Sequence, residues 1–349
     1  MSSANNSSAV PQPSAGDLSP LSEDTPPAAV IFGIEGTVLT QQEADLFRKT
    51  DPLGFILFAR NCDNPQQIRD LVLSLHQAVG RVVPVLIDQE GGRVQRMKPP
   101  HWKQYEPAKY FGDRFMSDFA KGRQLLQDQV KEISADLRSV GVNVNCAPVL
   151  DVLFPQTHAV IGDRAFSEDP QVVAALGSVA CEFYARSGII PVVKHIPGHG
   201  RAAADSHKNL PVVGATQAEL EQVDFAPYRQ LLTRDFSEAV WGMVAHVIYS
   251  DIDPKLPASC SRKVIWDTIR QDIGFKGFLV SDDIGMDALA AHGKPHRRAE
   301  DVLRGGCDAA LHCSGKFDEI EDIALRVQKM TTEAVRRYNR SISWYKGVV

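Results

Sequence analysis

The stretch Val82-Val83-Pro84-Val85-Leu86-Ile87-Asp88-Gln89-Glu90-Gly91-Gly92-Arg93 decides the fold. Its first six residues form a continuous apolar run, and polar residues and glycines follow at once. An apolar run of this length without alternation is typical of a parallel strand that is covered on both faces. We therefore predict a buried strand over residues 82–87 with polar side chains at its carboxyl end.

Similar runs recur along the rest of the chain. The predicted strands are Ala29–Ile34, Gly54–Phe58, Val82–Ile87, Val142–Cys146, Ile189–Val193, Ala239–Val244, Phe278–Val280 and Ala309–His312. Segments with the apolar spacing of a helix and few breakers lie between them. These predicted helices are Pro65–Val79, Gly122–Val140, Pro170–Ser187, Gln217–Leu232, Ser261–Asp272 and His296–Arg304.

The alternation of strands and helices predicts the fold class. Eight strands separated by helices indicate an α/β fold and, within it, a single (β/α)8 barrel of the TIM type over residues 29–349. A doubly wound open sheet is the alternative. The first predicted strand is not followed by Gly-x-Gly-x-x-Gly, and this counts against a dinucleotide-binding sheet.

The first 28 residues differ in composition from the rest. They hold seven serines and five prolines, and the first basic residue of the chain is Arg48. A segment so poor in apolar residues cannot offset its ordering entropy, so we predict a disordered tail over residues 1–28. Because the basic start and apolar core of a secretory signal are missing from it, we expect a cytoplasmic protein.

Charge and cysteine content exclude several classes. With 38 Lys and Arg against 43 Asp and Glu, the net charge of -5 does not favour a nucleic-acid partner. No apolar run approaches the roughly 18 residues of a membrane span, so no membrane partner is expected. The six cysteines include no Cys-x-x-Cys pair and indicate reduced thiols. The sequence specifies no oligomeric state.

Polar residues end five of the predicted strands. They are Asp88, Asp151, the pair Lys194 and His195, His246, and the pair Asp282 and Asp283. Barrel enzymes carry their chemistry where strands meet the following loops, at the carboxyl face, so these side chains predict an active site. For Asp88 we leave two interpretations open. It pairs with Arg93 as a loop residue, or it accepts hydrogen bonds from sugar hydroxyls beside Gly91-Gly92.

The densest polar stretch runs from Lys194 to His207. Its three histidines and Asp205 suggest a metal site, but Pro197 and Gly198 prevent His195 and His199 from sharing one helix face. The second interpretation is a catalytic pair, in which Asp205 orients His207 as an acid or base near neutral pH.

The pair Asp282 and Asp283 follows a buried strand. An aspartate before a helical segment is often a helix N-cap, and we assign that role to Asp283. A carboxylate at the end of a buried strand is well placed to act as a nucleophile, and we assign that role to Asp282.

Taken together, these stretches resemble family 3 glycoside hydrolases, and within them the bacterial β-N-acetylglucosaminidases of peptidoglycan recycling. The resemblance covers the chain from Ala29 onward. The matching stretches are Asp88 to Arg96, Ile161-Gly162-Asp163-Arg164-Ala165-Phe166, Lys194-His195-Ile196-Pro197-Gly198-His199-Gly200, Asp205-Ser206-His207, Ala245-His246-Val247-Ile248-Tyr249 and Ser281-Asp282-Asp283-Ile284-Gly285-Met286.

The resemblance implies a role for each matching residue. Asp282 would form a covalent glycosyl-enzyme with retention of configuration, and His207, assisted by Asp205, would be the general acid and then the base. This departs from the carboxylate pair of most retaining glycosidases. The sugar-binding positions implied by the family are Asp88, Arg96, Arg164, Lys194 and His195.

The resemblance also implies a substrate, namely GlcNAc β-1,4-linked to 1,6-anhydro-N-acetylmuramic acid in a muropeptide, with no cofactor and no metal. Two alternatives from other classes remain. A metal-dependent barrel hydrolase of amides or esters would lose activity with a chelator. A catalytically inactive sugar-binding protein would bind without turnover.

Overall fold

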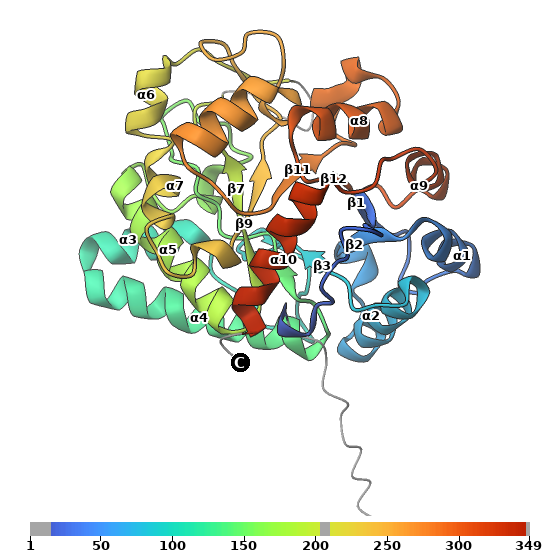
Figure 1. Ribbon diagram of the computed structural model, residues 1–349. Coiled ribbons are helices and arrows are strands. Elements are labelled where there is room, and N and C mark those ends of the chain that lie inside the picture. The colour runs from blue at the N-terminus through green and yellow to red at the C-terminus, as the bar shows by residue number, and fades with distance from the viewer. Residues whose placement is uncertain (1–14, 203–209, 347–349) are drawn as a thin grey trace, which may run out of the picture.

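The computed structural model describes residues 15–202 and 210–346 and contains a closed barrel of eight parallel strands. Helices surround this barrel (Figure 1). In spatial order the strands are β1 (Ala28–Gly33), β2 (Pro52–Leu57), β3 (Val85–Ile87), β6 (Val144–Asn145), β7 (Ile190–Ile196), β9 (Trp241–Val244), β11 (Leu279–Asp283) and β12 (Ala309–His312). The predicted (β/α)8 barrel is confirmed, and each predicted strand overlaps an observed one.

The helices lie outside the barrel and in its connections. They are α1 (Gln41–Thr50), α2 (Pro65–Val79), α3 (Ala108–Ser117), α4 (Phe119–Ser139), α5 (Pro170–Arg186), α6 (Gln217–Gln222), α7 (Ala226–Leu231), α8 (Pro295–Gly305), α9 (Phe317–Ala324) and α10 (Thr332–Lys346). No helix in the described ranges is long and apolar enough to cross a membrane.

Local capping explains why α2 has the predicted limits. The Asn64 side chain accepts a hydrogen bond from the Gln67 amide at the start of the helix, where Pro65 occupies the first position. Gly80 ends the helix in the left-handed region at a φ of 81°. An Asn cap, a proline in the first turn and a terminal glycine are strong boundary signals, and here they agree.

One predicted helix is interrupted. The segment predicted as a single helix over Gln217–Leu232 forms two short helices, α6 and α7, with a break between them. Pro227 lies in the first turn of α7. Because proline lacks an amide proton and clashes with the preceding turn, it is accepted at a helix start and disfavoured in an interior.

The predicted boundary of the N-terminal tail is wrong for residues 15–28. Leu18 and Leu21 are buried, and β1 begins at Ala28. The Leu21 amide donates to Asn339 Oδ1 at 2.8 Å, which ties this segment to α10. Averaging composition over 28 residues hid two apolar anchors inside a Ser/Pro-rich stretch. Residues 1–14 lie outside the described residues.

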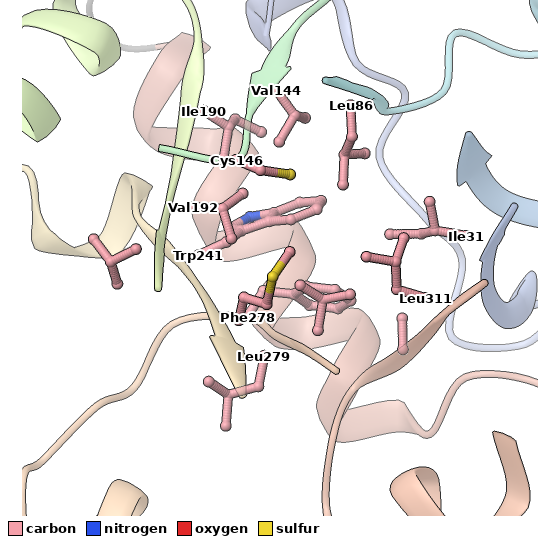
Figure 2. Close-up of a cluster of buried hydrophobic side chains, with 14 of the residues drawn as sticks. Ile31, Leu86, Val144, Cys146, Ile190, Val192, Trp241, Phe278, Leu279 and Leu311 are labelled. Carbon is pink, nitrogen blue, oxygen red and sulfur yellow. The ribbon is translucent and has the colours of Figure 1, made fainter. Parts of the chain in front are cut away.

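The barrel interior is filled by large apolar side chains (Figure 2). Trp241 packs against Phe278 with their ring centroids 4.6 Å apart, and Tyr338 of α10 lies 6.0 Å from Trp241. The indole Nε1 of Trp241 donates to Ser341 Oγ at 2.9 Å. Helix α10 therefore closes the amino-terminal end of the barrel, which leaves the carboxyl end for the site.

The packing predicts where the stability lies. Leu86→Ala removes a fully buried interior side chain and should lower the free energy of unfolding by about 2–5 kcal/mol, because it leaves a cavity. The matched control is Leu73→Ala on α2, where the side chain is 53% exposed and the change should stay within about 0.5 kcal/mol. Chemical denaturation measures both variants, and equal midpoints would contradict this account of the core.

Candidate active site

A cleft opens at the carboxyl end of the barrel. Its volume is about 470 Å³, and its walls come from the ends of the strands and from the loops that follow them. The charged and imidazole side chains that line it are Arg60, Asp88, Arg93, Arg96, Arg164, Lys194, His195, His199, Asp282 and Asp283. Six of the eight predicted site residues are among them, and their roles stay predictions. The other two, Asp205 and His207, lie outside the described residues.

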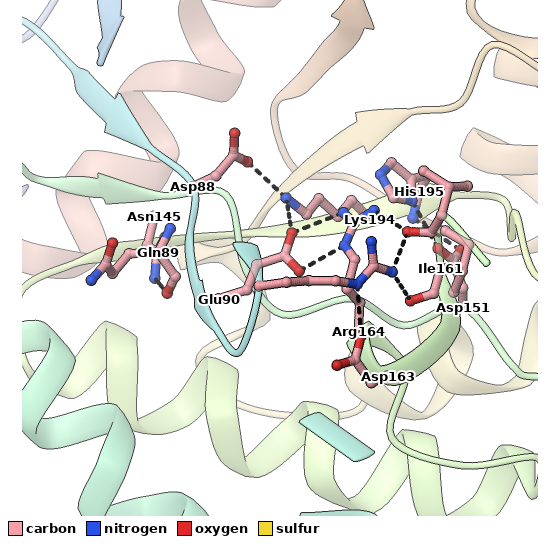
Figure 3. A network of polar contacts seen from close by, with 12 residues as sticks. Asp88, Gln89, Glu90, Asn145, Asp151, Ile161, Asp163, Arg164, Lys194 and His195 are labelled. Carbon is pink, nitrogen blue, oxygen red and sulfur yellow. Dashed lines mark hydrogen bonds and ion pairs between the residues drawn. The ribbon is translucent and has the colours of Figure 1, made fainter. Parts of the chain in front are cut away.

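A chain of buried ion pairs runs across one wall of the cleft (Figure 3). The Lys194 ammonium of β7 lies 2.8 Å from Asp88 Oδ1 and 2.6 Å from Glu90 Oε1. Arg164 of the 3-10 turn η3 (Gly162–Arg164) donates twice to Glu90, at 2.8 Å each. Arg96 completes the chain by donating to Asp88 Oδ2 at 2.9 Å.

Electrostatics keeps both carboxylates of this chain ionised. Burial alone would raise the pKa of Asp88, but Lys194 and Arg96 hold it well below its usual range. Burial likewise opposes the charge on Glu90, and Arg164 with Lys194 lowers its pKa below the ordinary value. The wall therefore presents fixed ammonium, guanidinium and carboxylate groups, which suit the donor and acceptor pattern of sugar hydroxyls.

Asp151 orients His195 from behind. Asp151 Oδ2 lies 2.7 Å from His195 Nδ1, and its Oδ1 accepts the amides of His195 at 3.1 Å and His199 at 2.7 Å. Burial would raise the pKa of Asp151, but His195 lowers it to about 2. An ionised partner on Nδ1 requires the proton there, so Nε2 is the atom left to meet a ligand in the cleft.

Asp282 lies near the end of β11 in the opposite wall. Its Oδ1 accepts the Asp283 amide at 2.8 Å. The N-cap role predicted for Asp283 is wrong, because the next helical segment, η7 (Asp287–His292), has Met286 in the cap position. Asp283 Oδ1 instead accepts the amides of Gly285 at 2.9 Å and Cys313 at 3.0 Å. Burial raises the pKa of Asp283 to about 6.

The segment that leads toward Asp205 and His207 is held by contacts with residues later in the chain as far as Ala202, the last described residue before the gap. Arg201 Nε lies 2.7 Å from Asp224 Oδ2, and the Tyr249 hydroxyl donates to Gly198 O at 2.8 Å. Gly198 has a φ of 135°, and a Cβ there would lie 2.9 Å from the Asp224 Cβ. Only glycine meets both demands, which explains its presence in this turn.

Among the charged residues at the site that received no role from the sequence are Glu90 and Asp151. Glu90 lies inside the stretch that decides the fold, and Asp151 follows a predicted strand. The only sequence signal for either residue was its position after a predicted strand. The contacts of each depend on a partner far along the chain, which is Arg164 for Glu90 and His195 for Asp151. Within the described ranges, no three His, Cys, Asp or Glu side chains form a group that could hold a metal ion.

Comparison with known proteins identifies the family. The model of the glycosyl hydrolase family 3 N-terminal domain matches residues 34–341. A β-hexosaminidase of Bordetella avium is 35% identical over 320 residues, which are 92% of this chain and 89% of that protein.

Solved structures agree with this result. NagZ from Neisseria gonorrhoeae in complex with N-trifluoroacetyl-D-glucosamine is 28% identical with a TM-score of 0.77, and the match covers 95% of this chain and 99% of that one. A family 3 β-N-acetylglucosaminidase from Paenibacillus sp. has a TM-score of 0.78 at 28% identity, and the match covers 92% of this chain and 60% of that longer one. The chain belongs to glycosyl hydrolase family 3 and is a glycoside hydrolase of its β-hexosaminidase group.

Proposed function

We propose that the protein is a retaining exo-β-N-acetylglucosaminidase that removes GlcNAc from GlcNAc-β-1,4-(1,6-anhydro)MurNAc muropeptides in cytoplasmic cell-wall recycling. The observation that carries the proposal is the pairing of two walls in one cleft. Asp282 occupies one, and Asp88, Lys194 and Arg164 occupy the other, where Glu90 links the two cations. In this proposal, a sugar held by that second wall presents its anomeric carbon to the Asp282 carboxylate.

The first chemical step forms a covalent intermediate. An Asp282 carboxylate oxygen bonds to C1 of the GlcNAc residue while the glycosidic C–O bond breaks. The departing oxygen takes a proton from His207. Asp205 orients His207 and keeps it basic enough to take up a proton again in the second step. In the second step water gives its proton to His207 and its oxygen to C1, and the bond to Asp282 breaks.

A histidine acid suits the charge of this cleft. Asp282 must stay ionised to attack. A second carboxylate near it would raise the pKa of Asp282, and Asp282 would raise the pKa of that carboxylate. A histidine delivers a proton near neutral pH without adding a negative charge to the wall. The resemblance supports this role for His207, and the leaving-group experiment below tests it.

Hydrolysis of 4-nitrophenyl β-N-acetylglucosaminide, beside the matching β-glucoside and with or without EDTA, tests the proposed activity. We expect turnover of the N-acetyl substrate alone, unchanged by EDTA. Turnover that EDTA abolishes would support a metal-dependent hydrolase instead. Binding of GlcNAc without turnover of either glycoside would support an inactive sugar-binding protein.

Replacing the nucleophile should stop catalysis. Asp282→Ala should lower kcat by at least about a thousandfold while the protein stays folded, because the covalent step loses its attacking group. Steady-state kinetics measures the loss, and circular dichroism checks the fold. Asp267→Ala, at an exposed carboxylate outside the cleft, is the control. An Asp282 variant that retains more than about a tenth of the wild-type kcat would remove this residue as the nucleophile.

Replacing the acid should affect substrates unequally. His207→Ala should reduce hydrolysis of a GlcNAc disaccharide by about a hundredfold or more and that of a 4-nitrophenyl glycoside far less, since only the poor leaving group needs a proton. Parallel kcat/KM measurements on the two substrates give the ratio. An equal loss on both would contradict the assignment of His207 as the acid.

Removing the shared anion of the ionic chain should weaken sugar binding. Glu90→Gln leaves Arg164 and Lys194 without their common partner, so KM should rise by about tenfold and stability should fall by about 3–5 kcal/mol. Glu132→Gln is the matched control, because its pair with Lys103 is largely exposed and contributes about 0–1 kcal/mol. A Glu90 variant with unchanged KM would show that this carboxylate does not position the sugar-binding cations.

A further inference from the structure

His246 lies directly beside the strand that carries Asp282. It follows β9 by two residues and is fully buried. The parallel register between β9 and β11 runs from Gly242 opposite Leu279 to Val244 opposite Ser281. Residue 246 therefore lies next to the end of β11, just beyond the last backbone pairing of the two strands.

The hydrogen bonds of His246 define its tautomer. Its Nε2 lies 3.0 Å from the Asp283 carbonyl oxygen, and its Nδ1 lies 2.7 Å from Ser259 Oγ. A carbonyl oxygen only accepts, so Nε2 carries the proton and Nδ1 accepts the proton of the Ser259 hydroxyl. Burial lowers the pKa of His246, which keeps this ring neutral.

Ser259 is itself held in place. It is fully buried in the turn η5 (Ala258–Cys260), and its amide donates to the Ala245 carbonyl at 3.1 Å. The serine and the histidine thus hold one another in place through a hydrogen bond between two neighbouring segments of the chain. The ring can therefore hold the Asp283 carbonyl at a fixed place.

The other edge of β11 is held by β12 and the residue after it. The Leu311 amide donates to Ser281 Oγ at 3.1 Å, and the Cys313 amide donates to Asp283 Oδ1 at 3.0 Å. Polar contacts therefore hold the end of β11 from both neighbouring strands. On the β9 side, the His246 side chain makes the contact after the backbone register has ended.

We propose that His246, supported by Ser259, is a positioning residue that fixes the main chain of β11 and through it the carboxylate of Asp282. Asp282 Oδ1 accepts the Asp283 amide, so a shift of the Asp283 main chain moves the carboxylate with it. The inference rests on the proposed nucleophilic role of Asp282. Attack on C1 requires close alignment, and a displacement near 1 Å costs about a hundredfold in rate.

Three variants test the inference on 4-nitrophenyl β-N-acetylglucosaminide and on a GlcNAc disaccharide. His246→Ala should lower kcat by about a hundredfold on both substrates and leave KM within about threefold, since the sugar-binding wall is untouched. His246→Gln, whose amide can donate to the Asp283 carbonyl, should recover at least about a tenth of wild-type kcat. Ser259→Ala removes one supporting hydrogen bond and should cost about two- to tenfold.

The matched control is another buried histidine. His76 on α2 is also buried, at 7% exposure, accepts the Val83 amide through Nδ1, and lines no part of the cleft. His76→Ala should therefore destabilise the protein without changing kcat at a temperature where it is folded. The control separates a general loss of packing from a loss of alignment at Asp282.

The possible results separate this inference from the proposed function. A folded His246→Ala or Ser259→Ala variant with wild-type kcat, or a loss confined to KM, would overturn the positioning role alone. If His246→Ala fails to fold, Ser259→Ala decides, and an unchanged kcat in that variant would overturn the role. Wild-type protein without turnover would overturn the proposed function and the inference with it.

Discussion

The Lys194 ammonium of β7 is 2% exposed and lies between the carboxylates of Asp88 and Glu90. A charge buried this deeply costs several kcal/mol unless opposite charges compensate it. Its partners follow β3, and Lys194 belongs to β7. The ion pairs therefore form only when these two parts of the barrel lie close together. Arg164 then joins Glu90 from a separate loop and extends the same requirement to η3.

The two walls of the cleft differ in composition. In one wall the charged side chains are paired with one another, so binding of a ligand there has fewer side chains to order. The other wall carries Asp282 on β11, whose neighbours hold it through backbone and side-chain hydrogen bonds. Under the proposed function, a charged wall whose groups are already paired, facing a carboxylate held by its neighbours, is the arrangement that covalent glycoside hydrolysis needs.

The barrel was predictable because each of its strands has a recognisable local sequence pattern, a short apolar run. A run such as Val85–Ile87 is apolar throughout, and helix α2 has boundary residues at both ends. Pairings between distant residues leave no such pattern. Glu90 and Asp151 acquire their roles from Arg164 and His195, which sequence spacing does not bring together.

Composition misled at the chain start for a similar reason. Leu18 and Leu21 are two apolar side chains among serines and prolines, and their segment is held by residues far along the chain, including Asn339 of α10. The interrupted helix before β9 is a different case. Pro227 is a local signal for a helix start, but the apolar spacing favoured one continuous helix across it.

The most direct test of the central claim is to trap the glycosyl-enzyme. The protein would be incubated with a 5-fluoro-N-acetylglucosaminyl fluoride, which slows breakdown of the intermediate, then digested and analysed by mass spectrometry. The account predicts one added fluorosugar on the peptide that contains Asp282, with fragmentation assigning it to that residue. A label on Asp283 or any other side chain, or steady turnover without a covalent species, would contradict it.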